Sequence, residues 1–285
     1  MFLSYLYGVI SYKYELFPFY QIKHVLNLTL DKVLYKYTGN NITFNKTQVN
    51  CDELKENTLS IIVLGQSNAA NSGIKKLNEI NNVYNYNILD DKCYLASDPL
   101  LGTTGSGAAI WTILGRDIIN GYLAQRVLIT PIAVSGSSIE QWQPDKHLFY
   151  PRIEMAFNQL EVKGITSHFV FWQQGESDQN MTSNEYFEKL NTLIQRINTL
   201  SSNKIKFFIA DSSYCHKTYS NNIRAANRQT IKNMNNVFSG PDIDQYQGAL
   251  YRYDDCHLST LGQNIAAKEW LNDIKPQIKQ LFKHE

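Results

Sequence analysis

The sequence predicts an α/β fold, a three-layer α/β/α sandwich built on a mainly parallel sheet. Short, continuous apolar runs recur along the chain, and amphipathic helical patterns separate them. Runs rich in β-branched and aromatic residues are typical of strands buried on both faces of a parallel sheet. Strand–helix alternation favours a doubly wound arrangement, whose functional sites lie at the carboxyl ends of the strands.

Each element of this fold is predicted by its own pattern. Apolar runs predict four strands, at residues 59–64, 127–134, 168–174 and 205–210. Helical periodicity predicts four helices, at residues 147–161, 183–200, 221–235 and 260–282. Residues 1–50 show neither pattern clearly. We therefore expect an N-terminal extension over 1–50 and the folded domain over 51–285.

Composition narrows the classes of function. The chain has 27 basic and 26 acidic residues, so it shows no electrostatic footprint for nucleic acid. Its 18 tyrosines suit contact with carbohydrate, although an aromatic core explains the same count. The apolar stretch 1–12 is shorter than the ~20 residues that cross a bilayer. It also lacks the basic region and cleavage site of a signal peptide. It is interpreted as a remnant of an export anchor, which would allow membrane association, or as a helix lying on the domain.

Four cysteines indicate in which kind of cellular compartment, oxidising or reducing, the protein folds. Cys51, Cys93, Cys215 and Cys256 show no C-x-x-C spacing of a zinc or redox site. Cys51 and Cys93 bracket the first predicted strand, and Cys215 and Cys256 each follow a predicted strand near its carboxyl end. Pairing as 51–93 and 215–256 is favoured and would imply an oxidising compartment. Four free thiols in a cytoplasmic protein are the alternative.

Two polar motifs follow the first two predicted strands. Gly65-Gln66-Ser67-Asn68 presents a serine on a turn, although glycine, serine and asparagine are also ordinary turn and cap residues. It is not the G-x-S-x-G nucleophile elbow, because Ala69 replaces the second glycine. The second motif contains Gly136 in a Ser-Gly-Ser-Ser loop. A glycine there lets a backbone N–H approach a developing oxyanion without a Cβ in the way.

Two further motifs complete the set. Gln174-Gly175-Glu176 ends the third strand, where a glutamine NH₂ can donate to the same oxyanion. A polar loop in which Glu176 caps the next helix is the alternative. Asp254 and His257 lie three residues apart, directly before the last helix. This spacing lets the carboxylate hold one imidazole nitrogen and leaves the other free to accept a serine proton. A capping or surface histidine is the alternative.

The order of these four motifs resembles the SGNH hydrolase superfamily. More narrowly, Gly-Gln-Ser-Asn and Trp-x-Gln-Gly-Glu are similar to the sialate O-acetylesterase and acetyl-xylan-esterase branch, over residues 58–275. The resemblance implies a flavodoxin-like, five-stranded sheet and a serine esterase that removes O-acetyl groups from a carbohydrate through an acetyl-enzyme. Many members carry Gly-x-Asn-Asp in the third motif, so Gln174 is expected to replace that asparagine.

The resemblance assigns roles to residues of this chain. Ser67 is the expected nucleophile, with His257 as its base and Asp254 as the orienting acid. The expected oxyanion donors are the N–H groups of Ser67 and Gly136 and the side chain of Gln174. Glu176 is an alternative triad acid or a substrate contact.

The resemblance also bears on partners and compartment. No metal or organic cofactor is implied, and the expected partner is an O-acetylated glycan or sugar. We expect an exported protein, periplasmic or at the cell surface, with a cytoplasmic one as the alternative. Three other functions stay open: an O-acetyltransferase, a carbohydrate-binding domain with a disused site, and a hydrolase of lipid or thioester acyl groups. The sequence specifies neither the sugar nor the oligomeric state.

Overall fold

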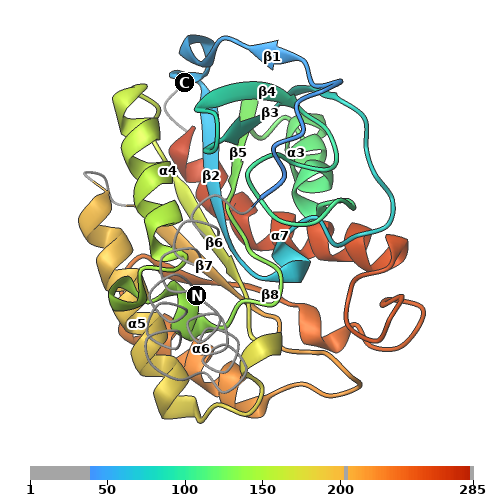
Figure 1. Ribbon diagram of the computed structural model, residues 1–285, viewed down its shortest axis with the longest axis vertical. Helices are drawn as coiled ribbons and strands as arrows, with labels where there is room; N and C mark the ends of the chain where they lie inside the picture. The colour runs from blue at the N-terminus through green and yellow to red at the C-terminus, as the bar shows by residue number, and fades with distance from the viewer. Residues whose placement is uncertain (1–38, 202–204, 283–285) are drawn as a thin grey trace, which may run out of the picture. The chain divides into compact units, whose positions relative to one another are not determined.

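An eight-stranded sheet forms the middle layer of the structure, a computed structural model that describes residues 39–201 and 205–282 (Figure 1). The strand order is β1-β4-β3-β5-β2-β6-β7-β8. The strands are β1 Gln48–Val49, β2 Thr58–Gly65, β3 Ile80–Asn87, β4 Lys92–Ala96, β5 Arg126–Pro131, β6 Phe169–Gln173, β7 Lys206–Asp211 and β8 Val237–Asp242. All pairings between β3 and β8 in this order are parallel, whereas β4 pairs antiparallel with both β3 and β1.

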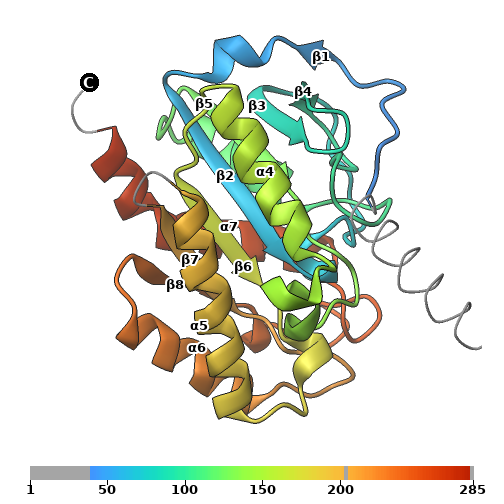
Figure 2. The same cartoon turned by 60° about the vertical axis from the view of Figure 1, so that its left-hand side comes forward.

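Helices cover both faces of this sheet. One layer contains α3 and α7, and the other contains α4, α5 and α6 (Figures 1 and 2). The helices are α3 Ile110–Asn120, α4 Tyr150–Val162, α5 Ser183–Leu200, α6 Asn221–Asn233 and α7 Thr260–Leu281. The predicted α/β/α sandwich with a mainly parallel sheet is therefore confirmed.

The sheet is wider than the sequence predicted. The four predicted strands correspond to β2, β5, β6 and β7, and the four predicted helices to α4, α5, α6 and α7. The expected count of five strands is wrong, because the sheet has eight. β3 escaped prediction since its sequence, INNVYNYN, mixes polar and apolar residues and its first half is partly exposed. The sheet also begins at Gln48, before the expected domain boundary at residue 51.

The centre of the core is aromatic. Trp270 of α7 stacks on Phe171 of β6 with ring centroids 4.5 Å apart, and Trp111 of α3 meets Trp270 edge-on at 5.4 Å. All three rings are buried. The offset and edge contacts that aromatic pairs prefer join α3 and α7 to the sheet. Part of the high aromatic content is therefore explained by the core.

Gly65 ends β2 at a point where a side chain would not fit. Its φ is +130°, and a Cβ built there would lie 2.0 Å from the carbonyl oxygen of Gln173 in β6. Glycine is the residue that tolerates both the positive φ and this close approach. The glycine of the first motif is thus required by the packing of β2 against β6, just before the chain turns at Ser67.

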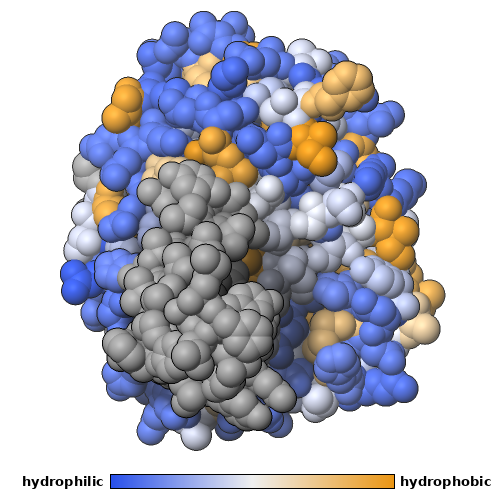
Figure 3. Space-filling model, viewed as in Figure 1, coloured by the Kyte–Doolittle hydropathy of each residue, from blue (hydrophilic) through white to orange (hydrophobic). Residues whose placement is uncertain are grey.

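Both expected disulfides are present, Cys51–Cys93 and Cys215–Cys256. Disulfides of this kind are typical of proteins that fold in an oxidising compartment. On the face shown in Figure 3, hydrophobic side chains are scattered among hydrophilic ones. No helix within the described ranges is both long enough and apolar enough to cross a bilayer. The apolar stretch 1–12 and most of the expected extension lie outside the described residues.

Candidate active site

The sheet topology brings the first three motifs to one edge. β5 and β6 flank β2, so the loops that follow these three strands leave the sheet side by side. The carbonyl oxygen of Gly65 accepts a hydrogen bond from Val134 N at 3.0 Å and from Ser137 Oγ at 3.3 Å. On the other side, Gly65 lies in register with Gln173. The segments carrying Ser67, Gly136 and Gln174 therefore meet at the end of β2.

Ser67 begins a short 3₁₀ turn, Ser67–Ala69, and only 5% of its surface is exposed. Gly136 occupies a turn closed by a hydrogen bond from Ser137 N to Val134 O, with a φ of +71°. Neither the Ser67 N–H nor the Gly136 N–H has a protein acceptor within the described part of the chain. Buried N–H groups are almost always paired, so a free donor at Ser67 points to a ligand. Gly136 is exposed, so its N–H is open to solvent or to a ligand. Two N–H groups without protein acceptors suit a developing oxyanion.

Asp254 and His257 form a local pair. Asp254 Oδ2 lies 2.7 Å from His257 Nδ1, and Asp254 Oδ1 accepts from the backbone N–H of His257 at 2.6 Å. Partial burial opposes ionisation of Asp254, but the hydrogen bonds from the His257 side chain and backbone outweigh it and lower its pKa. The carboxylate is therefore ionised at neutral pH and holds one imidazole nitrogen, which leaves Nε2 available.

The loop carrying His257 is tied to the nucleophile turn by side chains. Asn68 donates to Cys256 O and accepts from Leu258 N, each at 3.2 Å. The Tyr253 ring stacks on the His257 ring, and its hydroxyl donates to Ser72 O at 3.0 Å. No hydrogen bond joins Ser67 Oγ to the His257 ring among the residues described. In many enzymes such a contact tightens only when substrate binds.

The Gln174 side chain is fully buried, at 0% exposure. Its NH₂ lies within hydrogen-bond distance of three acceptors, Gln66 Oε1 at 3.0 Å, Ser137 O at 3.1 Å and Asp178 Oδ2 at 2.6 Å. Its Oε1 accepts from the Tyr186 hydroxyl at 2.8 Å. Two amide hydrogens facing three protein acceptors leave none for a substrate. An oxyanion role for Gln174 would require it to release one of these contacts.

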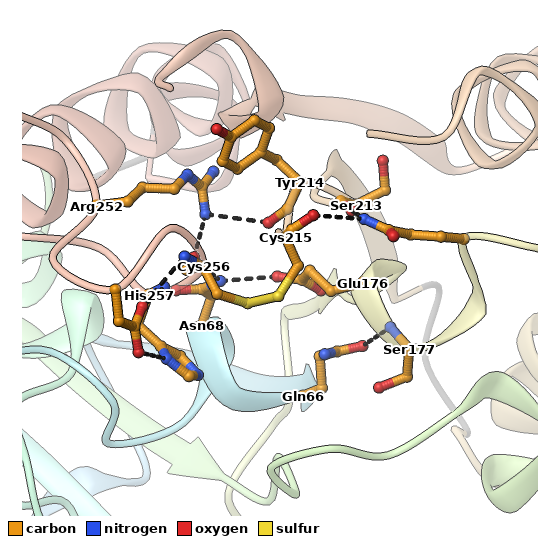
Figure 4. Close-up of a disulfide and its surroundings, with 12 residues drawn as sticks. Gln66, Asn68, Glu176, Ser177, Ser213, Tyr214, Cys215, Arg252, Cys256 and His257 are labelled. Carbon is orange, nitrogen blue, oxygen red and sulfur yellow. Dashed lines mark hydrogen bonds and ion pairs between the residues drawn. A yellow bond between two sulfur atoms is a disulfide. The ribbon is translucent and has the colours of Figure 1, made fainter. Parts of the chain in front are cut away.

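Glu176 is buried beside Asn68, and it does not contact His257. Its Oε1 accepts from Asn68 Nδ2 at 2.8 Å (Figure 4). The same oxygen accepts from Ser212 Oγ at 3.1 Å. Burial raises the pKa of Glu176 to about 7, against the effect of the hydrogen bond from Asn68. Of the two candidate acids, only Asp254 is in contact with the imidazole.

A disulfide and a buried arginine support the backbone next to His257. Cys256 is linked to Cys215, which follows β7. The Arg252 guanidinium donates to Cys256 O (Figure 4). It also donates to Ile243 O at 2.8 Å. Arginine provides several donors in a rigid fork, which suits the capture of several carbonyl groups of one loop. The residue directly before His257 is thus held by a covalent bond and by a hydrogen bond from Arg252.

Comparisons with known proteins identify the family of the chain. The family model of carbohydrate esterases described as sialic acid-specific acetylesterase matches residues 57–273. The chain belongs to this family. It is a carbohydrate esterase, and the matched region contains all four motifs. Among curated proteins, none matches the chain.

Solved structures share the fold of this esterase at low sequence identity. A protein from Arabidopsis thaliana superposes with a TM-score of 0.63 and 18% identity, covering 79% of this chain and 99% of its own. A carbohydrate acetylesterase from Xanthomonas citri superposes with a TM-score of 0.55 and 12% identity, and the match covers 79% of this chain and 57% of that protein. A family 3 carbohydrate esterase from Clostridium thermocellum superposes with a TM-score of 0.51 and 18% identity, and the match covers 79% of this chain and 98% of that protein.

Two residues next to the nucleophile escaped the sequence analysis. Asn68 and Gln66 were interpreted only as parts of the motif, whereas both make buried contacts to distant loops. A polar residue after a strand is ordinarily a helix cap. The only sign in the sequence of these buried contacts is the unusual run of three polar residues in the motif. Within the described residues of the esterase, no cluster of three or more histidine, cysteine, aspartate or glutamate side chains could hold a metal ion.

The two disulfides offer a matched test of how firmly the His257 loop must be held. They close loops of similar length, with sequence separations of 42 and 41 residues. On chain entropy alone, removing either should therefore cost about 4 kcal/mol of stability. We expect Cys215→Ser/Cys256→Ser to lower kcat by about tenfold to a hundredfold, because it frees the residue next to His257.

The control is the double variant Cys51→Ser/Cys93→Ser, which should lose comparable stability and keep its kcat. Thermal unfolding and esterase kinetics at a temperature where both variants are folded make the comparison. Equal changes in kcat for the two would contradict a special role of Cys215–Cys256.

Proposed function

We propose that the protein removes O-acetyl groups from an acetylated carbohydrate by a Ser67–His257–Asp254 mechanism. The observation that carries this proposal is the contact of 2.7 Å between Asp254 and His257 on a loop that Asn68 ties to the nucleophile turn. The family of the chain supports an ester-linked acetyl group on a sugar as the substrate. The two disulfides support export, to the periplasm or the cell surface.

The first half of the reaction acylates Ser67. His257 Nε2 accepts the proton of Ser67 Oγ as the oxygen attacks the acetyl carbonyl carbon. The negative charge that develops on the carbonyl oxygen is held by the N–H groups of Ser67 and Gly136, both free of protein acceptors among the described residues. The intermediate collapses, the sugar oxygen takes the proton from His257, and the deacetylated sugar leaves.

The second half releases acetate. Water gives a proton to His257 Nε2 and attacks the acetyl carbonyl, and the proton then returns to Ser67 Oγ as acetate departs. Asp254 holds the imidazole in one tautomer in both halves. In this proposal the Gln174 amide fixes the loops around the oxyanion site through Gln66, Ser137 and Asp178. It joins the oxyanion site only if substrate displaces one of these acceptors.

Acetate release from acetylated sugars tests the proposed activity. The wild-type protein should release acetate from one member of a panel such as O-acetylated sialic acid, acetylated xylan and acetylated monosaccharides. Ser67→Ala should keep the fold and lose ~10⁴–10⁶ in rate, because truncating the nucleophile removes the covalent route. A Ser67→Ala variant that retains a tenth of the turnover would rule out this nucleophile. Transfer of the acetyl group to an added sugar acceptor as a new ester, without release of acetate, would identify a transferase instead.

The identity of the orienting acid is tested by two isosteric variants. Asp254→Asn should lower kcat by ~10⁴, because the imidazole loses the carboxylate that sets its tautomer. Glu176→Gln should lower kcat by no more than about tenfold, because Glu176 contacts Asn68 and Ser212 and not the imidazole. The reverse ranking of the two kcat values would transfer the role to Glu176.

A further inference from the structure

We propose that Asn68 is a positioning residue for His257, and that buried Glu176 fixes the orientation of the Asn68 amide. This inference rests on the proposed function of Ser67 and His257. Asn68 follows the nucleophile directly, and its side chain is buried, with 4% of the residue exposed. Figure 4 shows its amide lying between the backbone of the His257 loop and the Glu176 carboxylate.

The two contacts of Asn68 with the loop bracket His257. Its Nδ2 donates to the carbonyl oxygen of Cys256, and its Oδ1 accepts from the N–H of Leu258, both at 3.2 Å. These backbone groups belong to the residues immediately before and after His257. A shift of the His257 backbone would break at least one of the two bonds. One short side chain, attached next to Ser67, therefore sets the separation between the nucleophile and its base.

Glu176 determines which end of the amide faces which group. Its Oε1 accepts from Asn68 Nδ2 at 2.8 Å, so the two NH₂ hydrogens are divided between Glu176 and Cys256. A flipped amide would place Oδ1 against a carboxylate oxygen and leave the Leu258 N–H unpaired, and both changes are unfavourable in a buried site. Ser212 Oγ lies 3.1 Å from the same Glu176 oxygen and holds the carboxylate in place.

The location of Glu176 supports a functional role. Glu176 is 8% exposed, and its Oε2 has no hydrogen-bond partner among the described residues. Burial of a carboxylate with an unpaired oxygen is destabilising, and burial raises its pKa. Local arrangements that cost stability concentrate at functional sites. An acceptor is needed here for Asn68, whereas a negative charge is not, so a neutral glutamine should serve.

Asn85 provides a matched control. It is also a buried asparagine, 1% exposed, whose Oδ1 accepts from Leu101 N at 2.6 Å and whose Nδ2 donates to Leu101 O at 3.1 Å. Its contacts hold the segment around Leu101 and do not involve the loop of His257. A purely structural role predicts the same outcome for the removal of either amide, namely lost stability with little change in kcat.

The test combines kinetics with thermal unfolding of the 285-residue chain. Asn68→Ala should lower kcat by ~10²-fold, because misplacement of a catalytic group by about 1 Å has that effect, while KM stays within about threefold. Asn85→Ala should lose comparable stability and keep kcat. The kcat of Glu176→Gln should stay within about tenfold of the wild-type value. Methionine is of similar length but offers Asn68 no carboxylate or amide oxygen, so the kcat of Glu176→Met should fall nearly as far as that of Asn68→Ala. The kcat of the double variant Asn68→Ala/Glu176→Met should be no lower than that of Asn68→Ala alone, because the two residues act through one contact.

A second readout separates this inference from the choice of substrate. The rate at which a fluorophosphonate probe labels Ser67 depends on the serine–histidine pair and on no particular sugar, so Asn68→Ala should slow it in parallel with kcat. Wild-type kcat or labelling in Asn68→Ala, or an equal loss in Asn85→Ala, would overturn the positioning role. A wild-type protein that neither labels nor hydrolyses any ester would instead overturn the proposed function and this inference with it.

Discussion

The site depends on the hydrogen bonds that the Asn68 side chain makes to the loop of His257. The parallel sheet places Ser67 and Gly136 together without further help, because β2 and β5 end side by side. His257 comes from a separate loop after β8, which no strand pairing joins to β2. Its position relies on Asn68, on Arg252 and on the Cys215–Cys256 disulfide, which hold the residues next to it.

Buried amides likewise hold loops together around the proposed oxyanion site. Gln66 Oε1 accepts from Gln174 Nε2 at 3.0 Å and from Ser177 N at 3.1 Å, which links the end of β2 to the loop after β6. Gln174 in turn contacts Ser137 O, in the loop after β5. A glutamine can satisfy a donor and an acceptor at once, so a few side chains replace the backbone pairing that loops lack. These hydrogen bonds restrain the loops, and catalysis by preorganised donors depends on such restraint.

The sequence predicted those parts of the molecule that depend on local or periodic information. Continuous apolar runs identified β2, β5, β6 and β7, whereas β3 was missed because its polar residues lie in a strand near the sheet edge. The Asp254–His257 contact could be expected because both residues belong to one loop. The contacts of Asn68 with the His257 loop and of Gln174 with Gln66 and Ser137 reach across 37 to 190 residues, so no spacing in the chain reveals them. The oxyanion role expected for Gln174 came from its place at a strand end and from the family resemblance, neither of which reveals these contacts.

The most direct test of the account is the identity of the residue that carries the acyl group. Nitrophenyl acetate acylates serine esterases quickly because its leaving group is activated, so an acid quench during turnover should trap the acetyl-enzyme for peptide mapping. We expect one acetyl group on the peptide that contains Ser67, and none on a folded Ser67→Ala variant. Acetyl found on another residue, or turnover that persists in Ser67→Ala, would contradict the account.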